Sequence, residues 1–112
     1  MAQSELLDTL FKANAEAAAQ GEYEVAYHTL MAALHLADRH ADLRAVERIN
    51  LLARQQQAMV EAVQPPHNLS SAQAKNRGQT PLFESLRIHI DSVRLRHESL
   101  AAFKRAKASS AG

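Results

Sequence analysis

The sequence contains no cysteine, which excludes disulfide frameworks, thiolate zinc sites, iron–sulfur clusters and thiol catalysis. Tryptophan is also absent, and glycine and proline occur only three times each. Alanine, by contrast, supplies 22 of the 112 residues. This balance favours helices and disfavours a β protein rich in turns. A chain of this length is expected to build one small domain around a single core.

Long hydrophobic runs are absent as well, since no segment approaches the roughly 18 apolar residues of a membrane span. The first residues, MAQSELLDTLFKANAE, lack the basic start and the apolar run of a secretory signal. We therefore expect a cytoplasmic protein with no membrane partner.

Apolar side chains recur at helical spacing in four segments, which predicts an all-α bundle of about four helices. Three helices are expected at 4–20, 22–38 and 41–64, and together they form the region 1–64. A linker follows at 65–80, because this segment is rich in residues that form turns. A long C-terminal helix is expected at 81–107, before a polar tail at 108–112.

Start and stop signals set these bounds. Ser4 is a suitable N-cap for the first helix, and Gly21 separates it from the second. Pro65 follows the third helix and cannot continue it, and Pro81 after a threonine is typical of a helix start.

Each predicted helix carries a stripe of side chains expected to be buried. The second helix is apolar over an arc so wide that it must be covered from two sides. The expected core positions are Leu6, Leu7, Leu10, Phe11, Ala13, Ala17 and Ala18; Tyr23, Val25, Ala26, Tyr27, Leu30, Ala32, Ala33, Leu34, Leu36 and Ala37; Leu43, Val46, Ile49, Leu52, Ala53, Met59, Val60 and Val63; and Phe83, Leu86, Ile90, Val93, His97, Leu100 and Phe103.

Residues 21–36, GEYEVAYHTLMAALHL, resemble the turn and second helix of a tetratricopeptide repeat. The positions that carry the resemblance are Gly21, Tyr23, Ala26, Leu30, Ala33 and Leu34. The resemblance covers one hairpin, about residues 4–38, and Asn14 stands where that family uses a small glycine or alanine. An alanine-rich helical hairpin of any origin could show the same pattern. A single repeat cannot cover its own faces, so helices three and four or a second copy must do so.

The resemblance implies a non-catalytic module for protein–protein interaction, of the adaptor or co-chaperone type. The candidate contact residues are Tyr23, Tyr27, His28 and Met31, which are equally compatible with a place in the core. An alternative is a self-associating protein, a homodimer held by the apolar stripe of the C-terminal helix.

Charge is divided unevenly along the chain. Residues 1–64 hold nine acids and five bases, whereas residues 65–112 hold eight bases and three acids. Arg94 and Arg96 are therefore candidates for contact with nucleic acid, anionic lipid or an acidic partner. The favoured interpretation is that the basic helix docks on the acidic hairpin of its own chain, or that its bases simply form a solvated face, so nucleic acid is not expected as a partner.

The six histidines form no pattern typical of a zinc site, and no residues suggest a catalytic centre. We expect no enzyme activity, no metal and no cofactor. His97 differs from the other histidines because it interrupts the apolar stripe of the last helix. It is interpreted as a polar break that sets register, with a metal ligand or a pH switch as the alternatives.

Overall fold

The computed structural model describes residues 2–63 and 82–111. These residues form four helices, α1 (Ala2–Ala19), α2 (Tyr23–Arg39), α3 (Leu43–Val63) and α5 (Leu82–Ala111). The two described ranges contain no strand. The predicted all-α bundle with a long C-terminal helix is therefore confirmed.

The turn between α1 and α2 ends the first helix with a left-handed glycine. The Glu22 N–H donates to the Ala17 carbonyl at 2.8 Å, and the Gly21 N–H donates to the Ala18 carbonyl at 3.1 Å. This is the hydrogen-bond pattern of a Schellman motif. Gly21 has φ of 76°, which a residue without a Cβ adopts at no steric cost. The glycine therefore reverses the chain where the sequence predicts a break.

The turn between α2 and α3 has the same pattern without a glycine. The Asp42 N–H donates to the Ala37 carbonyl at 2.9 Å, and the Ala41 N–H donates to the Asp38 carbonyl at 3.2 Å. Ala41 has φ of 53°, a left-handed conformation that is unfavourable for a residue with a Cβ. The Asp42 carboxylate then accepts a hydrogen bond from the Ala45 N–H at 3.1 Å, so it caps the start of α3.

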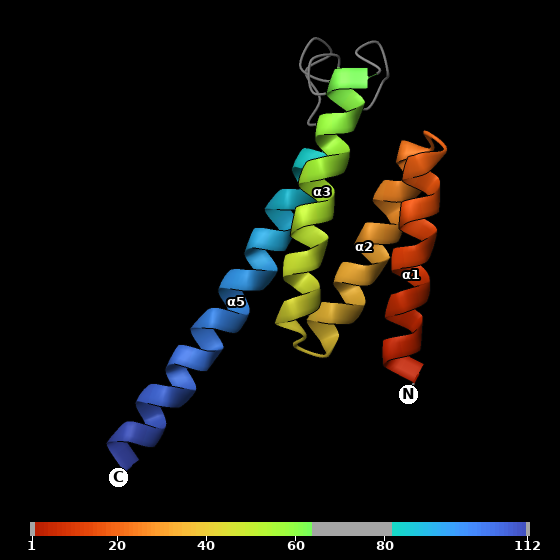
Figure 1. Ribbon diagram of the computed structural model, residues 1–112. Helices are drawn as coiled ribbons and strands as arrows, with labels where there is room; N and C mark the ends of the chain where they lie inside the picture. The colour runs from red at the N-terminus through yellow and green to blue at the C-terminus, as the bar shows by residue number, and fades with distance from the viewer. Residues whose placement is uncertain (1, 64–81, 112) are drawn as a thin grey trace.

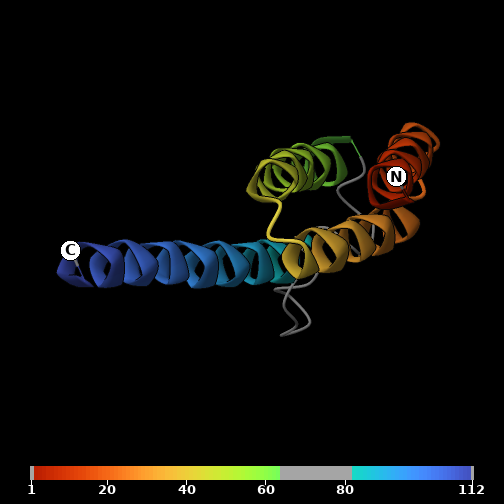
Figure 2. The same cartoon turned by 90° about the horizontal axis from the view of Figure 1, so that it is seen from below.

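The helices form two layers, with α1 and α3 in one layer and α2 and α5 in the other (Figures 1 and 2). The central helix is α2, which contacts each of the other three described helices. This contact with several neighbours agrees with the wide apolar arc of α2 and confirms that it is covered from more than one side.

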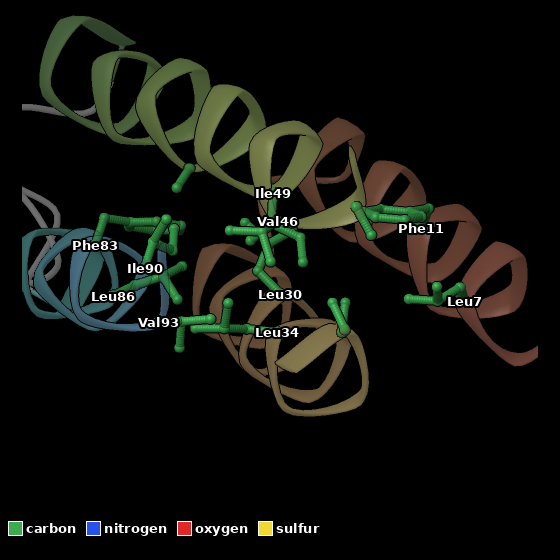
Figure 3. Packing of buried hydrophobic residues seen from close by; sticks show 14 of the residues in the cluster. Leu7, Phe11, Leu30, Leu34, Val46, Ile49, Phe83, Leu86, Ile90 and Val93 are labelled. Carbon is green, nitrogen blue, oxygen red and sulfur yellow. The ribbon is translucent and has the colours of Figure 1, made fainter. Parts of the chain in front are cut away.

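One hydrophobic core joins the four helices (Figure 3). Its largest fully buried apolar side chains are Leu30 and Leu34 of α2, Val46, Ile49 and Val60 of α3, and Phe83, Leu86 and Ile90 of α5. Burial of each such side chain contributes about 1.5–3 kcal/mol, so α5 is attached to the bundle mainly by its first half. A separate cluster of Ala17, Ala18 and Ala26 packs α1 closely against α2.

Two polar side chains, Asn14 of α1 and Gln56 of α3, are buried among these apolar groups, at 1% and 3% exposure. Gln56 Nε2 donates to Asn14 Oδ1 at 2.6 Å, and Asn14 Nδ2 donates to Gln56 Oε1 at 3.0 Å. The Asn14 amide also lies 2.9 Å from the Ala26 carbonyl oxygen, to which it donates. The reciprocal amide pair therefore joins two helices that lie on either side of α2.

The two halves of α5 have different surroundings. The first half packs into the core, whereas every side chain from Glu98 to Ser109 is exposed except that of half-buried Ala101. Thirty residues correspond to about 45 Å of helix, and the molecule measures 59 Å in its longest dimension. Residues 98–109, here called the distal segment, extend past the other helices (Figure 1).

The first and third helices begin at positions other than those expected. The first starts at Ala2, before the proposed Ser4 cap. The third starts at Leu43 rather than residue 41, because Ala41 occupies the left-handed turn and Asp42 provides the cap.

The C-terminal helix is longer than expected. It extends to Ala111, so residues 108–111 of the predicted polar tail are helical. This tail contains neither glycine nor proline before Gly112, so no residue in it interrupts the helix. The predicted linker at 65–80 and the predicted start at Pro81 lie outside the described residues.

Several residues of the expected buried stripes are exposed instead. Helices α1, α2 and α3 are each covered over a narrower arc than their apolar pattern predicts, and the distal segment of α5 lies beyond the bundle. The exposed residues are Leu6 and Ala13 of α1, Val25 and Ala32 of α2, Leu43 and Met59 of α3, and Leu100 and Phe103 of α5. The Val63 side chain lies outside the described ones.

Candidate interaction surface

The two tyrosines proposed as contact residues help to build the fold. Tyr23 is 4% exposed and belongs to the core, so its side chain offers almost no surface to a partner. Tyr27 is half-buried, and its ring meets that of Phe83 in α5 edge to face, with the ring centroids 6.1 Å apart. Tyr27 therefore contributes to the contact between α2 and α5.

The other two candidates on α2 differ in exposure. His28 is exposed, and its ring lies 4.9 Å from that of Tyr27, centroid to centroid. Met31 is half-buried and packs against the core. The four candidates on α2 therefore do not form one exposed patch.

The two arginine candidates of α5 face acidic side chains of the same chain. Arg94 Nε lies 2.7 Å from Glu47 Oε2 of α3. The Arg96 guanidinium pairs with the Asp38 carboxylate near the end of α2, and His97 Nε2 lies 2.9 Å from the same carboxylate oxygen. These contacts dock α5 on α2 and α3. The contact with Asp38 lies on the hairpin, as the docking interpretation expects, whereas the contact with Glu47 lies on α3, and Lys104 and Arg105 are exposed.

Asp38 is the centre of this contact. Hydrogen bonds from Arg96 and then from His97 lower the pKa of the Asp38 carboxyl, while partial burial opposes them. The Arg96 side chain is 53% exposed, and an ion pair this open contributes at most about 1 kcal/mol. The contact therefore fixes the orientation of α5 more than it raises the stability of the fold. His97 makes its polar contact with Asp38 at the point where the apolar stripe of α5 leaves the core.

The acidic partners could not be recognised in the sequence. Glu47 and Asp38 lie 47 and 58 residues from the arginines they contact. No local spacing rule connects residues so far apart, and only the net charge of the two segments indicated that they attract each other.

Several large apolar side chains of α5 are exposed. Leu100 and Phe103 in the distal segment are 49% and 64% exposed, and Ile88 and Leu95 are each 63% exposed. Lys104 and Arg105 are exposed beside Phe103. Exposed apolar side chains beside charged ones, such as Leu100 and Phe103 beside Lys104 and Arg105, are typical of protein interaction sites.

Several hollows lie on the hairpin side of the molecule. A cleft of about 340 Å³ lies between α1 and α3. In its lining, the Arg48 guanidinium lies 4.0 Å from the centre of the Phe11 ring, which is a cation–π contact. A second hollow of about 330 Å³ lies over α1 and α2 and is largely apolar. The first is lined by Leu7, Asp8, Phe11, Asp42, Arg44, Ala45 and Arg48, and the second by Leu6, Leu10, Ala32, His35, Leu36 and Arg39.

Within residues 2–63 and 82–111, no three His, Cys, Asp or Glu side chains come together in a way that could hold a metal ion. None of the helices formed by these residues has the length and apolar character needed to cross a bilayer.

Comparisons with protein-family models, with curated proteins and with solved structures find no match to this chain.

Proposed function

We propose that this protein is a non-catalytic interaction module that binds another protein through the distal segment of α5. One observation carries the proposal. The apolar stripe that α5 turns toward the core is buried from Phe83 to Val93 but exposed at Leu100 and Phe103. A stripe that continues past the core without cover has the form of a docking helix.

The chemistry of the distal segment specifies the kind of partner. Leu100 and Phe103 lie three residues apart, so they project from the same side of the helix. Lys104 and Arg105 add positive charge next to them. We expect the partner to offer an apolar groove with an acidic rim, which the helix enters as in other helix-in-groove complexes.

The resemblance of residues 21–36 to a tetratricopeptide repeat supports an adaptor or co-chaperone-like role. Members of that family act as scaffolds and have no catalysis of their own. In this proposal the hairpin of α1 and α2 serves as the base on which α5 is held, with α3 as a capping helix or a degenerate second repeat.

A pull-down from native lysate with the full chain tests the proposal. Leu100→Glu and Phe103→Glu, singly and together, should abolish capture of the bound protein while the circular dichroism spectrum stays helical. Leu51→Glu is the matched control, since Leu51 is an apolar residue of α3 with 55% exposure. Capture of the same protein by the double variant and by the control would refute the proposal.

A nucleic-acid-binding role receives less support. Two of the bases it requires, Arg94 and Arg96, contact Glu47 and Asp38 of the same chain. Retention on DNA at low salt that is lost on replacing Arg94, Arg96 and Arg105 would favour that role instead.

A further inference from the structure

A second stripe runs along α5 on a different side from the core contacts. It has alternating steps of three and four residues, which is the spacing of a heptad repeat. Ile88 and Leu95 within it are each 63% exposed. This outer stripe consists of Ser85, Ile88, Ser92, Leu95, Ser99, Ala102 and Ala106, all exposed except half-buried Ser85.

The outer stripe lies opposite the side that α5 buries in its own bundle. With Ile88 and Leu95 at the centre of a heptad seam, Ile90 and His97 occupy the heptad position that points away from it. Ile90 is fully buried in the core. Figure 2 shows the bundle on one side of α5 and the opposite long side uncovered by α1, α2 or α3. A helix could therefore lie on the outer stripe without displacing the bundle.

Acidic side chains border the outer stripe on one flank, and Arg96 and the imidazole of His89 border it on the other. Glu84, Asp91 and Glu98 recur every seven residues along one flank. His89 and Arg96 lie seven residues apart on the other. Asp91 and Arg96 have side chains that are 64% and 53% exposed. Each copy of α5 therefore carries both halves of a complementary pair.

We propose that α5 binds α5 of a second copy through the outer stripe, as a parallel and in-register coiled coil. In this arrangement Asp91 of each copy faces Arg96 of the other, and Glu84 faces His89. An antiparallel arrangement would place acidic flank against acidic flank and basic flank against basic flank. The charge pattern thus selects both the occupant, a second copy of this chain, and its direction.

Contact with Asp38 leaves Arg96 able to take part. A guanidinium has five N–H donors, and the contact with Asp38 is made through one terminal nitrogen. Arg96 would then bridge the end of α2 in its own chain and Asp91 in the second copy.

The seam is shallow, because serine or alanine fills five of its seven positions. Small side chains bury less apolar surface than leucine or isoleucine. We therefore expect a reversible dimer with a dissociation constant of the order of 10–100 µM. This self-association is separate from the proposed binding of another protein, and it would place two distal segments side by side.

Sedimentation equilibrium of the full chain tests the association. We expect a mass that rises toward that of a dimer between about 10 µM and about 1 mM. Leu95→Glu should keep the chain monomeric and helical, because it places a charge in the seam at a residue the fold leaves exposed. Leu51→Glu should dimerise like the wild type. A monomer throughout this range, or equal dimerisation of the Leu95→Glu variant, would overturn the proposal.

Disulfide trapping tests the direction of the helices, and the absence of native cysteines makes it specific. Ser92→Cys and Ser99→Cys should each form covalent dimers on oxidation, because a parallel in-register seam places identical residues opposite each other. Ala58→Cys, at an exposed position of α3, is the control. Trapping of the two seam variants no faster than the control would contradict the parallel arrangement.

The two proposals can fail independently. A monomeric chain that still captures another protein through Leu100 and Phe103 overturns the self-association alone. A chain that dimerises through the outer stripe but captures no other protein supports the self-association and overturns the proposed function.

Discussion

The buried amide pair of Asn14 and Gln56 gives the sharpest test of how this bundle is held together. Both side chains are almost fully buried, and each amide satisfies the other at 2.6 Å and 3.0 Å. Replacing Asn14 with alanine leaves the Gln56 amide nitrogen and oxygen without these partners. The Ala26 carbonyl keeps a partner, because the Thr29 hydroxyl also donates to it at 2.8 Å.

The expected magnitude follows from the groups left unpaired. Each buried donor or acceptor that loses its partner costs about 1–3 kcal/mol. With two such groups on Gln56, we expect Asn14→Ala to lower the free energy of unfolding by about 3–4 kcal/mol. Gln56→Ala should have a similar effect, because it leaves the Asn14 oxygen unpaired and opens a cavity.

The double variant Asn14→Leu with Gln56→Met separates pairing from burial. Replacing both polar partners with apolar groups of similar shape can be nearly neutral, so we expect a loss of about 1 kcal/mol or less. The two single alanine substitutions together should therefore cost at least about 5 kcal/mol more than this double variant. Gln55→Ala is the matched control, because Gln55 is exposed next to Gln56 and should change stability by less than about 0.5 kcal/mol.

Urea denaturation followed by circular dichroism at a helical wavelength measures these differences. The reasoning is refuted if Asn14→Ala costs no more than Gln55→Ala. It is also refuted if the apolar double variant loses as much as the two single substitutions together. Either result would mean that the amide pair does not hold α1 against α3.

Three further predictions use the same unfolding assay. Ala41→Gly should stabilise the protein by about 1 kcal/mol, because it relieves the left-handed strain, whereas Gly21→Ala should destabilise it by a similar amount; a loss for Ala41→Gly would contradict this. The pKa of Asp38 is lowered in the folded state, so the ionised carboxylate adds to the free energy of unfolding. This added stability is fully present above the unfolded pKa of about 4 and is lost as the pH falls through the lower folded pKa. Asp38→Asn should therefore lower the free energy of unfolding at neutral pH and make it depend less on pH in the acidic range. Identical profiles of stability against pH for the wild type and the variant would refute this prediction. Leu86→Ala should cost about 2–5 kcal/mol because it opens a cavity in the core, whereas Leu51→Ala should cost less than about 0.5 kcal/mol, and equal effects would contradict the core described above.

The structure also changes how substitutions in α5 should be interpreted. Leu86 and Ile90 would have been natural choices for breaking a dimer held by the apolar stripe of this helix. Both are fully buried in the chain's own core, so charging them would unfold the bundle instead of separating copies. Ile88 and Leu95, on the other side of the helix, can report on association without that effect.

Local sequence signals determined the fold class and most of the core. Alanine content and apolar spacing are properties of neighbouring residues, and a helix is a local structure, so each of the four described helices was predicted, although not all of their ends were. Leu30, Leu34, Ile49 and Ile90 were all placed in the core by spacing alone, and they are fully buried. Gly21 likewise marked the first turn, because its left-handed conformation is a property of the single residue.

Tertiary structure decided which apolar side chains were covered. Leu100 and Phe103 continue the same spacing as Phe83 and Leu86, yet they are exposed because α5 extends beyond the helices that cover its first half. Spacing identifies the side of a helix that is apolar, but only the lengths and positions of the neighbouring helices decide how much of that side they reach.

Tertiary structure also decided where the polar side chains went. Asn14 broke the expected pattern in the sequence, but its partner Gln56 lies 42 residues away and looked like one of three equivalent glutamines. The contacts of Arg94 and Arg96 with Glu47 and Asp38 depend in the same way on where three helices meet. A hydrogen bond or ion pair needs two groups within a few ångströms, and for groups far apart in the chain this distance exists only once the helices have packed.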